Sequence, residues 1–202
     1  MTRVPTIMPM KRPTRPTMAE RRSRLLVAAR DCFAANGWSG TTYEQIIVAA
    51  QMTPLAAQKV YNNSAACLIA LGESFHYSAF VEPLQVAVRA GADAQTQLQA
   101  ILNGFFNRMD DDPTTLRVLL RTLAGFDGTD AVMHSQHFRT IQRDTLADVI
   151  VLGQHAGVLR RSPAAERIAE EWLAALYGHA LMGISSLAMI DCLLHGLLKS
   201  DV

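Results

Sequence analysis

The segment that decides the fold is "TTYEQIIVAAQMTPLAAQKVYNN", residues 41–63. Its first half predicts a short amphipathic helix, because a threonine at its start can cap the helix and Ile46 and Ile47 can form its buried side. The tripeptide "QMT" then predicts a turn. Thr53-Pro54 opens a second short helix, since a threonine cap followed by proline is a typical helix start. We therefore expect two short helices joined by a tight turn.

The second of these helices has little to contribute to a hydrophobic core, because its side chains are mostly small or polar. A pair of short helices joined by a tight turn is the helix-turn-helix motif, whose second helix enters the major groove of DNA. Small side chains would let that helix approach the bases closely. Gln58 is then a candidate for adenine, Lys59 for a phosphate or guanine, and Leu55 and Ala56 for the thymine methyl group.

Charge is distributed unevenly along the chain. The first 62 residues contain nine Lys or Arg and three Asp or Glu, a net charge of +6, whereas the other 140 contain ten basic and fifteen acidic residues, a net charge of −5. A basic front joined to an acidic body favours contact between the front and a polyanion. A basic segment that only improves solubility is the alternative, and charge alone does not distinguish the two.

The composition indicates a soluble helical protein of one large or two modest domains. Half of the 202 residues are hydrophobic, 18% are charged and only 6% are aromatic, which favours helices packed on helices. The three cysteines form no CxxC pair, so we expect reduced thiols and a cytoplasmic location. No secretory signal is evident. The most apolar segment, residues 180–190, is shorter than the about 20 residues that span a bilayer, so we expect no membrane contact.

The sequence offers no enzymatic signature, because it lacks a nucleophile–base pair, a glycine-rich loop and paired carboxylates. An all-α enzyme remains an alternative that a perturbed carboxylate or histidine in a cleft would favour. His134 and His137 stand one helical turn apart, but no third metal ligand follows at a convincing spacing. We therefore expect no enzyme activity, no cofactor and no metal site.

Helical periodicity continues through the chain and predicts an all-α protein of about nine helices. We expect a flexible basic arm at residues 1–17, the helix-turn-helix domain at 18–64, a connecting helix at 65–84 that Pro83 kinks or ends, and a helical domain at 85–202. Asp112-Pro113 and Ser162-Pro163 repeat the cap-plus-proline pattern of a helix start. The later helices are expected at residues 93–109, 113–124, 130–155, 163–182 and 185–199.

The stretch "RRSRLLVAARDCFAANGWSGTTYEQIIVAAQMTPLAAQKVYNNSAACLIAL", residues 21–71, resembles the N-terminal DNA-binding domain of TetR/AcrR-type transcriptional regulators. The resemblance covers about 50 residues and runs without a gap. It rests on the following positions: Leu25, Leu26, Ala28, Ala29, Phe33, Asn36, Gly37, Thr41, Thr42, Ile46, Ala50, Thr53, Tyr61, Leu68 and Leu71.

The resemblance implies a DNA interface around the second short helix. The residues expected to contact or position DNA are Arg21, Thr41, Thr42, Tyr43, Thr53, Pro54, Leu55, Ala56, Gln58, Lys59 and Tyr61. Free backbone N–H groups near residues 41–43 are expected to hold a phosphate.

Three positions depart from the family pattern. Gln51 replaces the usual turn glycine, at a place that requires a positive φ. Gln58 replaces a tyrosine and Ser64 a lysine, both common phosphate contacts in the family. These departures favour an alternative in which the TetR-like fold has lost DNA recognition and acts as a ligand-binding or protein-interaction module.

By the same resemblance, residues 85–202 form a ligand-binding and dimerisation domain. A pocket for an unknown small-molecule effector is expected between residues 95 and 180, with the candidates Phe105, Phe106, Met109, Leu120, Phe126, Met133, His134, His137, Phe138, Trp172 and Tyr177, and with Arg121 as a further polar group. Each of these residues could instead be an ordinary core or surface residue that contacts no ligand. The last two helices contain more apolar residues than one helix pair needs, so we expect them to form a homodimer interface, with simple core as the alternative. The expected function is a ligand-responsive repressor that binds a palindromic double-stranded operator as a dimer.

Overall fold

The computed structural model describes residues 16–184 and 187–198, and these residues form ten α-helices, a π-helical segment and no strand. The predicted all-α fold is therefore confirmed. The basic arm expected at residues 1–17 lies outside the described residues except for Pro16 and Thr17. The helices are α1 (Met18–Asn36), α2 (Tyr43–Ala49), α3 (Pro54–Gln58), α4 (Ser64–His76), the π-helix η1 (Tyr77–Val81), α5 (Glu82–Arg89), α6 (Ala94–Asp111), α7 (Pro113–Leu123), α8 (Thr129–His155), α9 (Ala165–Met182) and α10 (Leu187–Leu197).

The cap-plus-proline pattern predicts two of the three helix starts correctly. The Thr53 and Asp112 side chains accept hydrogen bonds from backbone N–H groups three residues later, and proline follows each. Ser162-Pro163 behaves differently, because helix α9 begins two residues after the proline, at Ala165. There the Pro163 carbonyl accepts a hydrogen bond from the Gln154 side chain, at 3.1 Å, and remains outside the helix.

Helices α4, η1 and α5 form one continuous rod from Ser64 to Arg89. The sequence predicts a kink or an end at Pro83, but the helical path continues through it. The π-helical turn before the proline uses i→i+5 hydrogen bonds, such as the one from the Glu82 N–H to the Tyr77 carbonyl. A π-turn is a known way for a helix to accommodate an interrupted hydrogen-bond ladder.

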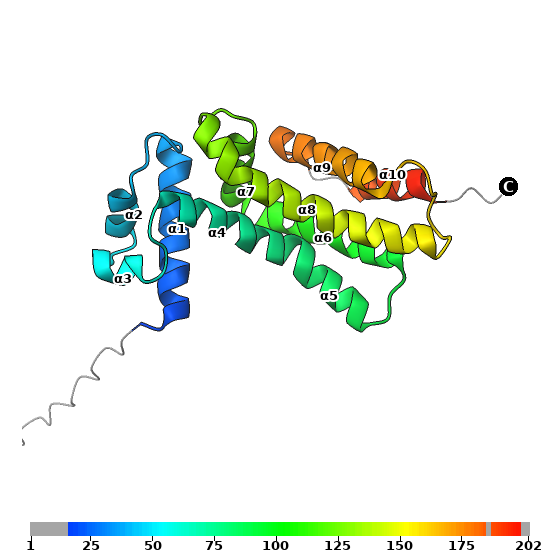
Figure 1. Ribbon diagram of the computed structural model, residues 1–202, viewed down its shortest axis with the longest axis horizontal. Helices are drawn as coiled ribbons and strands as arrows, with labels where there is room; N and C mark the ends of the chain where they lie inside the picture. The colour runs from blue at the N-terminus through cyan, green and yellow to red at the C-terminus, as the bar shows by residue number, and fades with distance from the viewer. Residues whose placement is uncertain (1–15, 185–186, 199–202) are drawn as a thin grey trace, which may run out of the picture.

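Figure 1 shows α1 to α3 at one end of an elongated molecule and α5 to α10 stacked at the other, with the α4 rod running between them. Helix α1 packs against α4 and α7. Two polar contacts accompany this packing: Arg30 of α1 lies 3.6 Å from Asp112 at the start of α7, and the Ser39 hydroxyl donates to the Asp127 carbonyl after α7. The helix-turn-helix end therefore rests directly on α7.

No helix within residues 16–184 and 187–198 combines the length and the apolar character that crossing a membrane requires.

Candidate DNA interface and ligand pockets

The turn between α2 and α3 has the geometry that its sequence position demands. Gln51 has a φ of 53°, the only positive value among the described non-glycine residues. The Gln51 N–H donates to the Val48 carbonyl at 3.0 Å, and the Met52 N–H donates to the Ile47 carbonyl at 3.2 Å. These two bonds form a Schellman motif, which normally ends a helix with glycine. The prediction that this position needs a positive φ is confirmed, and glutamine adopts it here.

Helix α3 is held in place by aromatic contacts on its inner side. The Tyr43 hydroxyl on α2 donates a hydrogen bond to the Tyr61 carbonyl just after α3. The Arg22 guanidinium on α1 lies 5.9 Å from the centre of the Tyr61 ring, within cation–π range. Ala57 of α3 is fully buried beneath these groups. Helices α1 and α2 therefore both help to fix the position of a helix that is only five residues long.

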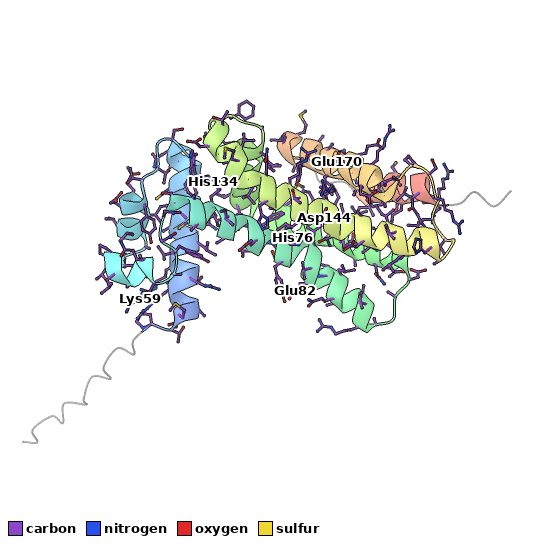
Figure 2. All side chains as sticks on the ribbon, viewed as in Figure 1. Lys59, His76, Glu82, His134, Asp144 and Glu170 are labelled. Carbon is purple, nitrogen blue, oxygen red and sulfur yellow. The ribbon has the colours of Figure 1, made fainter. Side chains whose placement is uncertain are left out.

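The outer side of α3 is exposed along its whole length. Thr53, Pro54, Leu55, Gln58 and Lys59 are all exposed, and the Leu55 side chain retains 67% of its accessible surface. Ala56 is half-buried between the two sides. Lys59 lies at the end of the molecule far from Glu170, Asp144 and His76 (Figure 2). The structure thus brings the predicted α3 residues together on one free surface.

The remaining predicted interface residues lie beside this surface in different roles. The Thr41 hydroxyl is buried and donates to the Gly37 and Cys32 carbonyls, at 2.7 and 3.1 Å, so it organises the loop before α2. Thr42 caps α2 through a reciprocal pair of bonds with Gln45. Arg21 is half-buried on α1.

No protein-family profile and no curated protein matches the chain. Many solved structures do. A TetR-family transcriptional regulator from Syntrophomonas wolfei superposes with a TM-score of 0.76 at 18% identity, over 89% of this chain and 94% of its own. The SmeT–triclosan complex gives a TM-score of 0.72 at 20% identity, over 90% and 93%. A regulatory protein of the TetR family from Rhodococcus RHA1 gives 0.65 at 19% identity, over 90% and 98%. The chain has the TetR-family fold.

Most of the aromatic residues expected to line an effector pocket lie in the core of this TetR-family fold. Phe105, Phe106, Phe138 and Trp172 are at most 4% exposed. Phe105 contacts the rings of Phe75, Phe80 and Phe106 edge-on, with centroids 5.7 to 6.1 Å apart. Edge-to-face packing at these distances is typical of a well-filled interior.

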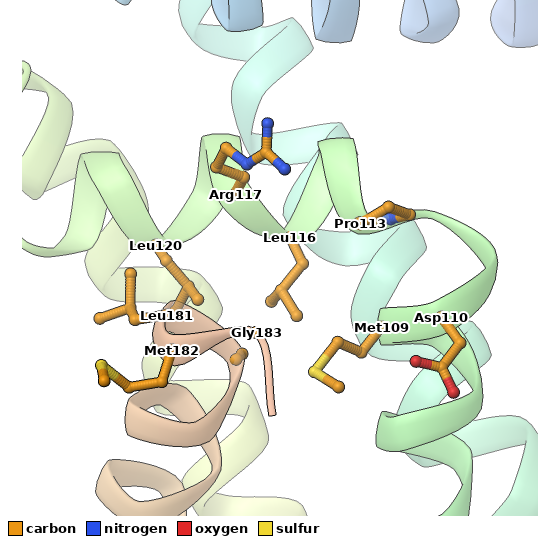
Figure 3. A pocket seen from close by; sticks show the side chains of 10 residues that line it. Met109, Asp110, Pro113, Leu116, Arg117, Leu120, Leu181, Met182 and Gly183 are labelled. Carbon is orange, nitrogen blue, oxygen red and sulfur yellow. The ribbon is translucent and has the colours of Figure 1, made fainter. Parts of the chain in front are cut away.

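Two pockets lie instead along α7 and α9. The larger, about 490 Å³, is lined by Met109, Leu116, Leu120, Leu181 and Met182 among others. Figure 3 shows that these leucine and methionine side chains gather around it, while the Arg117 guanidinium points away from them. We call this the first pocket. Of the predicted pocket residues, it contains Met109 and Leu120.

The second pocket, about 270 Å³, lies on the other side of Leu120 and Leu181, which line both pockets. Helices α7, α8 and α9 form its walls. The apolar part consists of Leu120, Leu123, Ala124, Val132, Leu173, Ala174 and Leu181, and the polar part of Gln136, Arg139, Glu170 and Tyr177. Arg139 lies 3.4 Å from the Glu170 carboxylate, and Arg143 lies 3.9 Å from the same carboxylate. The second pocket therefore has a largely apolar wall with one ionic cluster on its polar side.

The other predicted pocket residues lie outside these two pockets. Phe126 and Met133 are 76% and 68% exposed. The His134 ring contacts Trp38 at 5.4 Å, and His137 lies 3.7 Å from the Glu73 carboxylate. In the part of the chain that the structure describes, no three metal-ligating side chains come together.

A half-buried histidine, not predicted from the sequence, lies between α4 and α8. The His76 ring stacks on Phe80 at 5.6 Å, and its Nε2 atom lies 3.4 Å from the Thr145 hydroxyl. Its Nδ1 atom is buried without a hydrogen-bond partner. Burial, and to a smaller extent the neighbouring His137, lowers the pKa of His76 to about 4. His76 is therefore neutral near pH 7.

A second polar residue that the sequence analysis missed is Gln142, which is completely buried on α8. The Tyr177 hydroxyl donates a hydrogen bond to its Oε1 atom, whereas its Nε2 atom is buried without a partner. A signal was present in the sequence, since Gln142 stands midway between Phe138 and Leu146 on the buried stripe of the helix. A lone polar residue in such a stripe indicates a special role.

Proposed function

We propose that the protein is a DNA-binding transcriptional regulator that acts as a ligand-responsive repressor. The observation that carries this proposal is the free outer surface of α3, which is held by Tyr43, Tyr61 and Arg22 but used by no other part of the described chain. A helix presented in this way fits the major groove. The Schellman geometry at Gln51 ends α2 and begins the turn to α3 despite the missing glycine.

Each residue on the α3 surface has a proposed role. Gln58 is suited to adenine and Leu55 to a thymine methyl group, whereas Lys59 supplies the positive charge for guanine or a phosphate. Arg21 and the α2 N-terminus at Thr42 are proposed to meet the phosphate backbone beside them. Since Ser64 and Gln58 replace two usual phosphate contacts, Lys59 carries an unusually large share of the electrostatic attraction.

We propose that two copies pair through α9 and α10 to read a palindromic operator. The inner residues of these helices, such as Leu176 and Ile190, are buried in the same chain. Their outer side exposes small residues, including Gly178 on α9 and Ala188, Cys192 and Gly196 on α10. An outer face of small residues on an antiparallel helix pair suits a four-helix bundle with a second copy.

We further propose that the effector is a small apolar molecule that binds between α7 and α9. Helix α7 lines both pockets and also supports α1, with Asp112 at its start contacting Arg30. A ligand that favours a different position of α7 would shift the distance between the two α3 helices of a dimer. The affinity for DNA would then fall by a factor that is set by how much more tightly the ligand binds that conformation than the DNA-binding one.

The test is a gel shift with fragments from the region upstream of the protein's own gene, at 50 and 200 mM salt. Wild type is compared with Lys59→Ala and with Arg89→Ala, a matched removal of an exposed positive charge at the distant end of α5. We expect a retained fragment, two chains per fragment, and a weakened complex with a smaller salt dependence only for Lys59→Ala. If no fragment is retained above nonspecific background at either salt, the proposal is wrong and the alternative, a TetR-like module without DNA recognition, applies.

A further inference from the structure

We propose that the first and second pockets together form one elongated site for an unbranched alkyl alcohol, whose chain occupies both pockets and whose hydroxyl group lies at the rim of the second. The inference rests on the proposed effector site and adds the chemical class of its ligand. It is carried by two neighbouring apolar cavities, of about 490 and 270 Å³, that share one wall.

The shared wall consists of two leucine side chains, Leu120 of α7 and Leu181 of α9, which line both pockets. Figure 3 shows these two side chains close to each other between the helices. Leu120 is held in the core at 3% exposure, whereas Leu181 is 55% exposed and is the last residue but one of α9. Exposed side chains change rotamer within nanoseconds. We therefore expect rotation of Leu181 to join the two pockets.

The shape of the joined site selects an unbranched chain. A passage opened by one leucine rotation is narrow, so it admits a chain of methylene groups more readily than a ring or a branched group. The chain would contact apolar side chains in both pockets, namely Met109, Leu116 and Met182 in the first and Leu123 and Leu173 in the second. Each CH₂ group removed from water adds to the affinity. A long chain therefore gains from both pockets, whereas a short chain gains from one.

The ionic cluster of the second pocket suits a neutral hydroxyl group. The Arg139 and Arg143 guanidinium groups lie 3.4 and 3.9 Å from the Glu170 carboxylate, and the three side chains are 34% to 55% exposed, which places them at the rim. A hydroxyl group can donate to a carboxylate and accept from a guanidinium at once, whereas a charged group would be repelled by one of the two. In the first pocket Asp110 and Arg117 are exposed, and the Arg117 guanidinium points away from the apolar side chains (Figure 3).

The experiment compares a long and a short alcohol, 1-dodecanol and 1-hexanol, by isothermal titration calorimetry on the full chain without DNA. Ala180→Phe fills the first pocket and Ala124→Phe the second, because each alanine lines only one of the two. We expect each variant to weaken the binding of 1-dodecanol by about tenfold or more, the effect of keeping about two CH₂ groups out of the protein. The binding of 1-hexanol, whose chain stays in the second pocket, should be weakened by Ala124→Phe alone.

Ala156→Phe is the matched control. Ala156 caps the C-terminus of α8 as Ala124 caps that of α7, and both alanines are exposed and followed by a glycine with a positive φ. Ala156 lines neither of the two pockets. This variant should bind both alcohols as the wild type does.

A second measurement needs no substitution in the pockets and therefore does not depend on the folding of Ala180→Phe. Met109 and Met182 line the first pocket but not the second. In wild type labelled with ¹³C at the methionine methyl groups, the signals of these two residues should shift on addition of 1-dodecanol and stay in place with 1-hexanol.

Four results would overturn the inference: no binding of 1-dodecanol to wild type, an unchanged affinity for it in either Ala124→Phe or Ala180→Phe, equal weakening of 1-hexanol binding in both variants, or unshifted Met109 and Met182 signals. An unchanged affinity in one variant alone would mean that the ligand occupies a single pocket. Because these measurements contain no DNA, a failure of the proposed DNA binding in the gel shift would leave them and their interpretation unchanged.

Discussion

Replacing Gln51 with glycine should stabilise the protein, because the turn between α2 and α3 forces this residue to a φ of 53°. A residue with a Cβ atom in the left-handed region costs about 1–2 kcal/mol through contact between that atom and the backbone. Glycine avoids this contact but loses more backbone freedom on folding, about 0.5–1 kcal/mol. The Gln51 side chain is exposed, so little packing is lost. The expected gain in the free energy of unfolding is about 0.5–1 kcal/mol.

The assay is urea denaturation followed by circular dichroism, with the slope of the transition checked for constancy. In a thermal scan, the same gain corresponds to a rise in midpoint of roughly 1–4 °C for a chain of this size. Ala49→Gly is the matched control, two residues earlier in α2 at an exposed position, and should lose about 0.5–1 kcal/mol.

Gln51→Ala separates loss of the side chain from relief of the backbone, because alanine keeps the Cβ atom. We expect it to remain within about 0.5 kcal/mol of wild type. If Gln51→Gly loses as much stability as Ala49→Gly, the left-handed conformation costs the native chain nothing and the explanation given for this turn is wrong.

Two further predictions concern the core. Below pH 6.5 the unfolded chain binds a proton at His76 that the folded chain, with a pKa of about 4 there, does not bind. The free energy of unfolding should therefore fall between pH 6.5 and 4 and be unaffected above pH 7, and because water screens the half-buried ring we expect a fall of about 1–2 kcal/mol. Urea midpoints at pH 7.5 and 4.5 should drop less for His76→Gln, and an equal drop would contradict the role of this residue. Gly104→Ala would place a methyl group in overlap with the Ala79 carbonyl oxygen and 2.5 Å from Pro83 Cγ, so it should cost about 2–3 kcal/mol by urea denaturation. Gln99→Ala, on the exposed side of the same helix, should cost less than about 0.5 kcal/mol, and similar losses for the two variants would show that α6 can move away.

The helix-turn-helix end was predictable because its signals are local. Capping side chains such as Thr42 and Thr53 bond to N–H groups three residues away, and the short turn leaves the chain few alternatives. The positive φ at Gln51 was predicted from the family resemblance, because a turn glycine usually occupies this position. Helix starts failed where a distant group intervened, as at Pro163, whose carbonyl is bound by Gln154.

The pocket was not predictable in the same way, because it depends on which apolar residues face one another. From the sequence alone, Phe105 and Leu120 are equally good candidates for the lining of a pocket. In the structure Phe105 is enclosed by other rings, whereas Leu120 lies between two pockets. Gln142 was visible as a polar residue in an apolar stripe, but its partner Tyr177 is 35 residues away on another helix.

The amino-acid sequence by itself determined the helical class, the helix-turn-helix segment and the helix ends that are capped locally, because periodicity and capping act over four residues or fewer. Only the tertiary structure decided that the aromatic residues fill the core, that the open space lies beside α7 and α9, and that Gln142 keeps one unpaired end behind Tyr177. The physical reason is that space and unpaired polar atoms are properties of the packed assembly of helices, which no single helix contains.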